Sequence, residues 1–121
     1  MLDALELKPF VPSRDFDLSC RFYRDLGFEE RLVGDELAEF SLGAQAFLLQ
    51  DFYRKDWAQN CVRHLLVSDA RAWWRHIKQL ELFDRYPGTR GTPPEDKPWH
   101  ICQFSLVDPC GVLWHIAHPT R

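Results

Sequence analysis

Two histidines, His64 and His115, carry side chains that can do chemistry near neutral pH. Each lies in a short apolar segment that predicts a β-strand, and the strand positions around them hold smaller apolar residues, so both can face one cavity. An imidazole there can ligate a metal, transfer a proton or bind a ligand directly. It can also be a hydrogen-bonded residue of the cavity wall, and the sequence leaves these alternatives open.

Aromatic side chains suggest what such a cavity binds. Trp99 follows a proline at the start of a predicted strand, and Tyr53 and Trp57 lie in a polar segment in the middle of the chain. The flat faces of these rings suit planar or cationic ligands. We therefore expect the three aromatic residues to form a ligand site with the two histidines. Phe104 and Lys8 are further residues that we expect at this site.

Other kinds of site find little support. Glu95 and Asp96 are adjacent acids, but they lie beside a lysine in a Pro-rich segment, which favours a solvated turn. No serine lies in a nucleophile motif, no glycine-rich loop suits a phosphate, and the four cysteines lack the spacing of zinc sites. We expect these cysteines to be buried free thiols in a reducing cytoplasm.

Length and composition predict one globular domain. The chain has 121 residues, of which 45% are hydrophobic, and a formal net charge of −3 at pH 7. That charge is too small to favour nucleic acid or an anionic membrane as a partner. Charged residues interrupt the N-terminal segment, and no apolar run is long enough to span a membrane, so we expect neither a signal peptide nor a membrane span.

The elements that must position these residues occur in the same order twice. In the first half we expect a strand at 5–11, a helix opened by Asp15 and ended by Gly27, and strands at 28–33, 37–42 and 46–50. In the second half we expect a strand at 61–67, a helix opened by Asp69, and strands at 82–86, 99–107 and 112–117. The segments at 51–60 and 87–98 are predicted to be loops.

Each half therefore has the order β-α-β-β-β, and short sequence matches indicate a duplication. An aspartate opens each helix, and a Phe-Ser-Leu triplet recurs at 40–42 and 104–106. We predict an α+β fold of two equivalent modules, at about 1–52 and about 61–121, joined by a linker at about 53–60. The modules are expected to pair around one shared cleft.

Four segments together resemble the vicinal-oxygen-chelate superfamily, which includes glyoxalases, extradiol dioxygenases and bleomycin-resistance proteins. They are FY-x-x-LGF at 22–28, HLLV-x-D-x-x-AWW at 64–74, the Pro-Trp pair at 98–99, and F-x-L-x-DP-x-G-x-LW at 104–114. The match extends over essentially the whole chain. It implies that each module curls a mixed sheet into half of a cup, with the helices outside.

The resemblance also implies where the metal-dependent enzymes of this superfamily would hold their ion. The ligand positions fall at Lys8, within residues 48–50, at Val62 and at His115. Lysine and valine cannot ligate a metal, and residues 48–50 offer only a glutamine, so we expect no bound metal and no cofactor. The alternative is a glyoxalase-like lyase or thiol transferase that recruits a metal through His64 and His115.

The resemblance is nearest to the bleomycin-resistance proteins, which implies a metal-free binding protein. Those proteins are homodimers whose ligand crevices lie between modules of different subunits. They exchange an N-terminal strand hinged at a proline, which Pro9 matches, and a Pro-Trp element that Trp99 matches helps bind the flat part of the drug. We thus expect the chain to sequester a planar aromatic or cationic compound in a dimer crevice.

Overall fold

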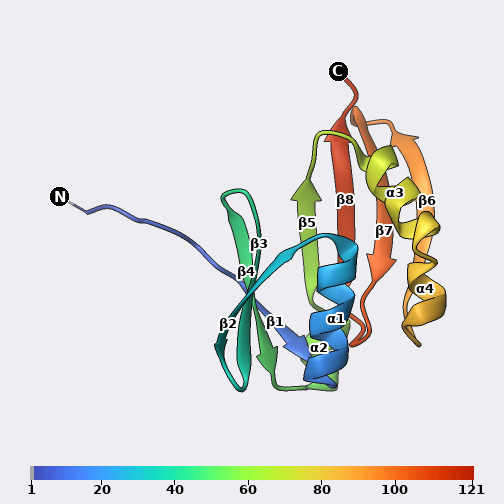
Figure 1. The fold of residues 1–121 in the computed structure, drawn as a ribbon. Coiled ribbons are helices and arrows are strands. Elements are labelled where there is room, and N and C mark those ends of the chain that lie inside the picture. The colour runs from blue at the N-terminus through green and yellow to red at the C-terminus, as the bar shows by residue number, and fades with distance from the viewer. Residues whose placement is uncertain (1) are drawn as a thin grey trace.

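The computed structural model describes residues 2–121, and its strands form two four-stranded mixed sheets (Figure 1). The first module consists of β1 (Phe10–Ser13), α1 (Phe16–Leu26), β2 (Glu29–Gly34), β3 (Leu37–Leu42) and β4 (Gln45–Asp51). After α2 (Lys55–Gln59), the second module consists of β5 (Val62–Leu66), α3 (Ala70–Gln79), α4 (Leu82–Arg85), β6 (Arg90–Lys97), β7 (Ile101–Val107) and β8 (Leu113–Pro119). The predicted α+β fold is confirmed.

The two sheets share one topology, so the modules can be compared position by position. The strand orders are β1-β4-β3-β2 and β5-β8-β7-β6. In each sheet the strand that comes first along the chain, β1 or β5, pairs in parallel with the one that comes last, β4 or β8. The other pairs are antiparallel. Ser41 lies opposite Ala46 in the first sheet, and Ser105 lies opposite His115 in the second.

Aspartate side chains start the two long helices, as predicted. Asp15 accepts a hydrogen bond from the backbone N–H of Leu18, and Asp69 accepts one from that of Ala72. Gly27 ends α1 with a φ of 128°, a conformation that costs glycine little because it has no Cβ. Helix α1 contacts β2 and β4, whereas α3 contacts β6, β7 and β8, so each long helix covers its own sheet.

A buried hydrogen-bonded cluster joins the two modules. The Tyr23 hydroxyl donates to Asp108 Oδ2 at 2.5 Å and accepts from Trp114 Nε1 at 2.9 Å. The rings of Phe28 and Phe47 lie 5.8 Å and 5.2 Å from the Trp114 ring. Burial raises the pKa of the Asp108 carboxyl, although the hydrogen bond from Tyr23 opposes that rise. Buried polar groups of each module thus find their hydrogen-bond partners in the other module.

Three predictions of local structure are wrong. Residues 82–86 form mainly the short helix α4, because a five-residue apolar run has no periodicity that separates a strand from one helical turn. Residues 90–97 are an edge strand and not a loop, and the register shift between Thr92 and Glu95 accommodates two prolines there. Glu95 and Asp96 therefore lie on β6, and the predicted loop at 51–60 contains α2.

The N-terminal segment forms an arm that extends away from both sheets (Figure 1). The predicted strand at 5–11 begins only at Phe10, because the residues before it have no neighbouring strand along most of their length. Leu2, Leu5 and Leu7 are between 92% and 99% exposed. These three leucine side chains are thus almost fully exposed to solvent.

The four cysteines are buried free thiols, as predicted. Burial raises the pKa of Cys20 and of Cys110 to about 12, which keeps these thiols protonated and unreactive at neutral pH. No helix within residues 2–121 is long and apolar enough to cross a membrane.

Candidate ligand-binding site

The two faces of the second sheet differ in what covers them. Helix α3 packs on one face, and alternate residues of β7 and β8 are buried there, among them Phe104 and Trp114. The residues between them are less buried and point to the opposite side. We call this opposite side of β5, β6, β7 and β8 the open face.

A row of polar residues crosses the open face. The strand register places Thr92 opposite Ser105, Ser105 opposite His115, and His115 opposite His64. Apolar residues of β5 and β8 flank this row on both sides, namely Val62, Leu66 and Leu113, whereas Ala117 at the fourth such position is buried. The open face therefore presents hydrogen-bonding groups within an apolar surround, which is the usual composition of a small-molecule site.

Hydrogen bonds, partial burial and neighbouring charges determine the contacts and the protonation of the His115 ring. Its Nδ1 lies 2.8 Å from Ser105 Oγ and 3.3 Å from Gln103 Nε2. Partial burial, followed by the neighbouring His64 and Lys97, lowers the pKa of His115. The ring is therefore neutral near pH 7, and it can offer both a donor and an acceptor to a ligand.

These residues do not fit a resident metal ion. A catalytic metal site needs about three protein ligands, and the two histidines are joined by hydroxyl and amide groups, which are poor ligands. Within residues 2–121 no three His, Cys, Asp or Glu side chains are placed to hold an ion together. Lys8 Nζ is engaged by the carboxylates of Glu6 and Glu39, each at 2.6 Å.

Trp99 lies at one end of the second sheet, in the turn between β6 and β7. The turn is tight, since His100 has a φ of 64° and its N–H donates to the Lys97 carbonyl at 3.1 Å. Trp99 is 61% exposed. Its indole can therefore meet a ligand without disturbing the core.

Tyr53 and Trp57 lie at the other end of the sheet, so the chain does not bring them together with Trp99. They precede β5, which starts beside the beginning of β8, whereas Trp99 precedes β7, which starts beside the end of β8. A strand of this length separates the two ends by about 20 Å. The Tyr53 ring is also covered by Arg14 at 5.5 Å, and the Trp57 ring packs 6.2 Å from that of Phe52.

Two further predicted site residues do not face this surface. Phe104 is 1% exposed and packs 5.3 Å from the Trp74 ring, on the face covered by α3. Strand alternation explains this placement, because Ser105 points to the open face and its neighbour must point away. The same alternation, applied to residues 101–107, would have found Ser105 and Gln103, which we did not predict. Lys8 is held by its ion pairs near the first sheet.

Hollows lie on the open face and at its edge. One of about 240 Å³ is lined by Thr92, Ser105, Leu113 and neighbouring residues. Another of about 150 Å³ lies where the two sheets meet, and His64 lines it together with Pro9. The polar row thus has open space at both ends, one beside β6 and one beside β5.

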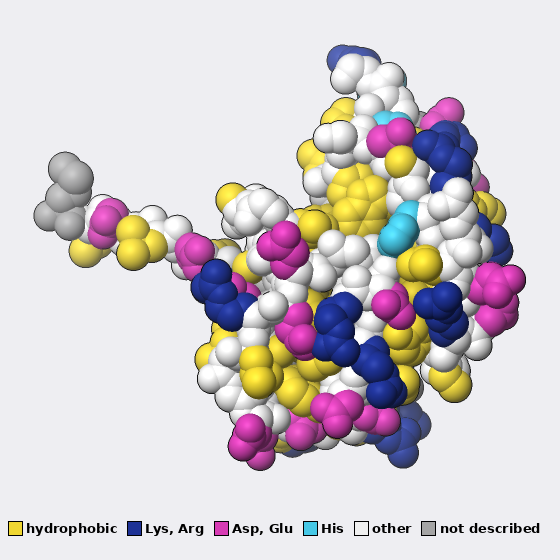
Figure 2. Space-filling model, viewed as in Figure 1, with side chains coloured by type: hydrophobic (Ala, Val, Ile, Leu, Met, Phe, Trp, Pro, Cys, Tyr) yellow, Lys and Arg dark blue, Asp and Glu magenta, His cyan; other side chains and the backbone are white. Residues whose placement is uncertain are grey.

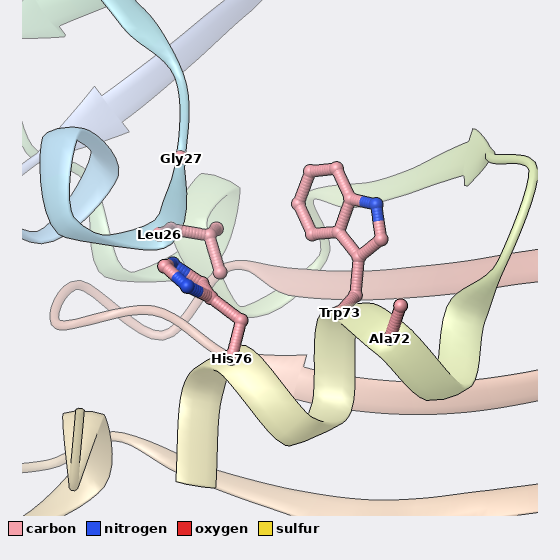
Figure 3. A pocket seen from close by; sticks show the side chains of 5 residues that line it. All are labelled: Leu26, Gly27, Ala72, Trp73 and His76. Atoms are coloured by element: carbon pink, nitrogen blue, oxygen red, sulfur yellow. The ribbon is translucent and has the colours of Figure 1, made fainter. Parts of the chain in front are cut away.

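A separate hollow of about 270 Å³ lies among the helices, away from the polar row. Figure 3 shows the side chains of Leu26, Trp73 and His76 around it, between the end of α1 and helix α3. The His76 ring is held by a hydrogen bond of 2.9 Å to the Asp25 carbonyl. This hollow is almost entirely apolar and offers a ligand few polar contacts.

Charges of both signs are mixed over one face of the molecule. On the face that Figure 2 shows, acidic and basic side chains alternate, with hydrophobic patches between them. The formal net charge of −3 agrees with this mixture. This face therefore presents no broad field of one sign to attract a charged ligand from a distance.

No protein-family model matches this chain, whereas a known protein does. A bleomycin resistance protein from Klebsiella pneumoniae is 30% identical over 112 residues, which cover 87% of this chain and 85% of that protein.

Solved structures share the fold. A bleomycin-binding protein crystallised with bleomycin has a TM-score of 0.79 at 24% identity and covers 95% of this chain and 98% of its own. The bleomycin resistance determinant of transposon Tn5 has a TM-score of 0.80 at 23% identity and covers 98% of this chain and 100% of its own. The fold, the motifs and the sequence match together show that this chain belongs to the bleomycin resistance protein family, within the vicinal-oxygen-chelate fold.

Proposed function

We propose that this protein binds a small planar aromatic or cationic compound at the open face and sequesters it without chemical conversion. The observation that carries the proposal is the 30% identity to a bleomycin resistance protein over most of both chains. A protein of the same fold holds bleomycin in its crystal structure, which supports small-molecule binding as the role of the fold here. The free thiols support action in the cytoplasm.

The open face offers the contacts that such a ligand needs. Trp99 can stack on a planar group, which contributes roughly 0.5–1.5 kcal/mol beyond the buried area. His64, Ser105 and His115 can then hydrogen-bond to polar groups of the same molecule. The formal net charge of −3 provides little long-range attraction for a strongly cationic drug, so we expect the natural ligand to be bound mainly through these short-range contacts.

We further propose a homodimer in which a second copy covers part of the open face and completes a crevice. The leucines of the arm, together with Phe10, Val62 and Leu66, are exposed apolar residues that a single chain leaves uncovered. An obligate interface of this kind should bury about 2,000 Å² or more in total. Pro9, at the base of the arm, is the expected hinge if the arm is exchanged between subunits.

A titration with metal-free bleomycin, followed by tryptophan fluorescence, tests the binding proposal. We expect a saturable change in fluorescence, and chromatography should recover the compound unaltered. Absence of any change with bleomycin and with a panel of planar cationic dyes would contradict the proposal, and release of a product would favour the lyase or transferase. Light scattering at micromolar concentration tests the assembly, and a monomer would contradict the dimer.

A further inference from the structure

We infer that the open face selects a planar aromatic compound that carries a carboxylate, and that Arg90 binds this carboxylate at the β6 end of the polar row. The inference rests on the proposed binding function and names the charge of the ligand. Among planar compounds it favours an organic acid over a cation. Thr92 and His115 supply further hydrogen-bond donors at the same edge of the sheet.

Arg90 is a cation without a counter-charge. It is exposed at the start of β6, where the strand register places it opposite Val107 on the open face. Within residues 2–121 its guanidinium takes part in neither an ion pair nor a hydrogen bond. Its N–H groups are therefore available to a ligand.

The hollow of about 240 Å³ on the open face lies directly beside this guanidinium. Its lining includes Arg90, Thr92, Ser105 and Leu113. A guanidinium presents paired N–H groups that match the two oxygens of a carboxylate, and a threonine hydroxyl can donate to the same group. The apolar side chain of Leu113 lines the same space and can contact a ring. The hollow thus combines a cationic edge with an apolar wall.

The contacts of His115 add another donor beside this hollow. An amide nitrogen can only donate, so Gln103 Nε2, 3.3 Å from His115 Nδ1, requires Nδ1 to be an acceptor. The Ser105 hydroxyl, 2.8 Å from the same nitrogen, then donates to it as well. In the neutral ring the hydrogen therefore lies on Nε2, and Nε2–H can donate to an acceptor of the ligand.

The charges of the open face favour an anion, although the whole chain has a formal net charge of −3. On this face β6 presents Arg90, Glu95 and Lys97. Lys97 engages Glu95, which leaves the charge of Arg90 unbalanced. His115 experiences the same positive surroundings, since burial and then the neighbouring His64 and Lys97 lower its pKa.

The equivalent edge of the first module has the opposite character. Ser41 on β3 corresponds to Ser105 on β7, because the two sheets share one topology. The edge-strand partner of Ser41 is Glu29, whereas that of Ser105 is Thr92. The fold thus accepts an acid at the position of Thr92, where it would repel a carboxylate. Sheet formation does not require a neutral and a basic residue on β6, and anion binding explains them.

Calorimetric titration of the untagged protein with four probes that share one naphthalene ring tests the inference. They are naphthoate, naphthamide, naphthyl phosphate and naphthylmethylammonium, so the ring stays the same while the charge changes. We expect naphthoate to bind about tenfold more tightly than the amide and the cation. It should also bind more tightly than the phosphate, because one guanidinium balances a single charge and a phosphate monoester carries about −1.5 to −2.

Substitutions assign the preference to Arg90. Arg90→Gln should weaken naphthoate about tenfold and leave naphthamide unchanged. Arg90→Lys keeps the charge but loses the paired N–H groups, so it should retain only part of the preference. Arg21→Gln, which removes another exposed arginine on helix α1 of the first module, is the matched control and should bind every probe as the wild type does. Thr92→Val should weaken naphthoate less than Arg90→Gln.

Several results would overturn the inference. They are binding of the cation or the phosphate that equals or exceeds that of naphthoate, or an unchanged naphthoate affinity in Arg90→Gln when its melting temperature shows that it is folded. Metal-free bleomycin, titrated in parallel, separates this inference from the proposed function. If bleomycin binds and naphthoate has no advantage over naphthamide, the carboxylate inference fails and the binding function stands. Absence of binding by bleomycin and by all four probes contradicts both.

Discussion

Trp114 and His115 are adjacent in β8 and show how the two faces of one sheet differ in role. Trp114 is 4% exposed, packs against Phe47 and donates a hydrogen bond to Tyr23 in the other module. His115 points the opposite way and contacts Ser105 across the open face. One residue along the strand thus separates the core from the candidate site.

This difference separates effects on stability from effects on binding. On the helix-covered face each large side chain touches many others, so its removal leaves a cavity that the surroundings cannot fill. On the open face the side chains border solvent, so their removal changes what the surface can bind and leaves the core as it is. The following substitutions test this separation, from the largest expected effect to the smallest.

Replacing Trp114 by alanine should have the largest effect on stability. We expect the free energy of unfolding to fall by about 3–5 kcal/mol, because the indole of this second-module residue packs on rings of the first module and its N–H donates to Tyr23 in the core. Urea denaturation followed by circular dichroism measures this change. A loss under about 1 kcal/mol would show that the modules do not depend on this contact.

Tyr23→Phe tests the polar part of the same face. The change removes the hydroxyl between Asp108 and Trp114, so a buried carboxyl and a buried indole N–H each lose a partner. We expect a loss of about 1–3 kcal/mol in the free energy of unfolding. Phe28→Leu is a suitable comparison, since it alters the same cluster without removing a hydrogen bond. A free energy of unfolding that is unchanged in Tyr23→Phe would show that the hydroxyl network does not stabilise the fold.

Trp99→Ala tests the open face. We expect bleomycin to bind at least tenfold more weakly, which corresponds to about 1.4 kcal/mol, while the melting temperature stays near that of the wild type. Phe52→Ala is the matched control, because Phe52 is another exposed aromatic residue at the opposite end of the sheet. If Trp99→Ala lowers the melting temperature and leaves the affinity unchanged, Trp99 belongs to the core and the proposed site is misplaced.

The smallest expected effect is a pH dependence that originates at His115. Its pKa is lowered in the folded protein, mainly by burial, so the folded state favours the neutral ring. That preference stabilises the fold above the ordinary histidine pKa and is lost as the pH falls through the lowered value. The stability of the wild type should therefore decrease between about pH 7 and pH 5 more steeply than that of His115→Gln, and parallel curves would contradict this assignment.

Several features could be predicted from sequence because they depend on local chemistry. Asp15 and Asp69 are side chains that can satisfy the first N–H groups of a helix, and Gly27 tolerates the positive φ that ends one. The recurring Phe-Ser-Leu triplet revealed the duplication because equivalent strands keep equivalent inward and outward positions.

Tertiary structure decided which of the chemically capable residues share a surface. Tyr53, Trp57 and Trp99 all carry rings suited to a ligand, but a whole strand length separates the first two from the third. Residue type and chain position do not encode that distance, because it depends on which end of β8 each connection reaches.

The predictions for residues 82–86 and 90–97 are wrong for a similar reason, since packing of Leu82 in the core and pairing of β6 with β7 outweigh weak local preferences. By itself the sequence determined the modules, the helix ends and the presence of His64 and His115, whereas the pairing of β5 with β8 and of β8 with β7 placed those histidines and Ser105 in one row.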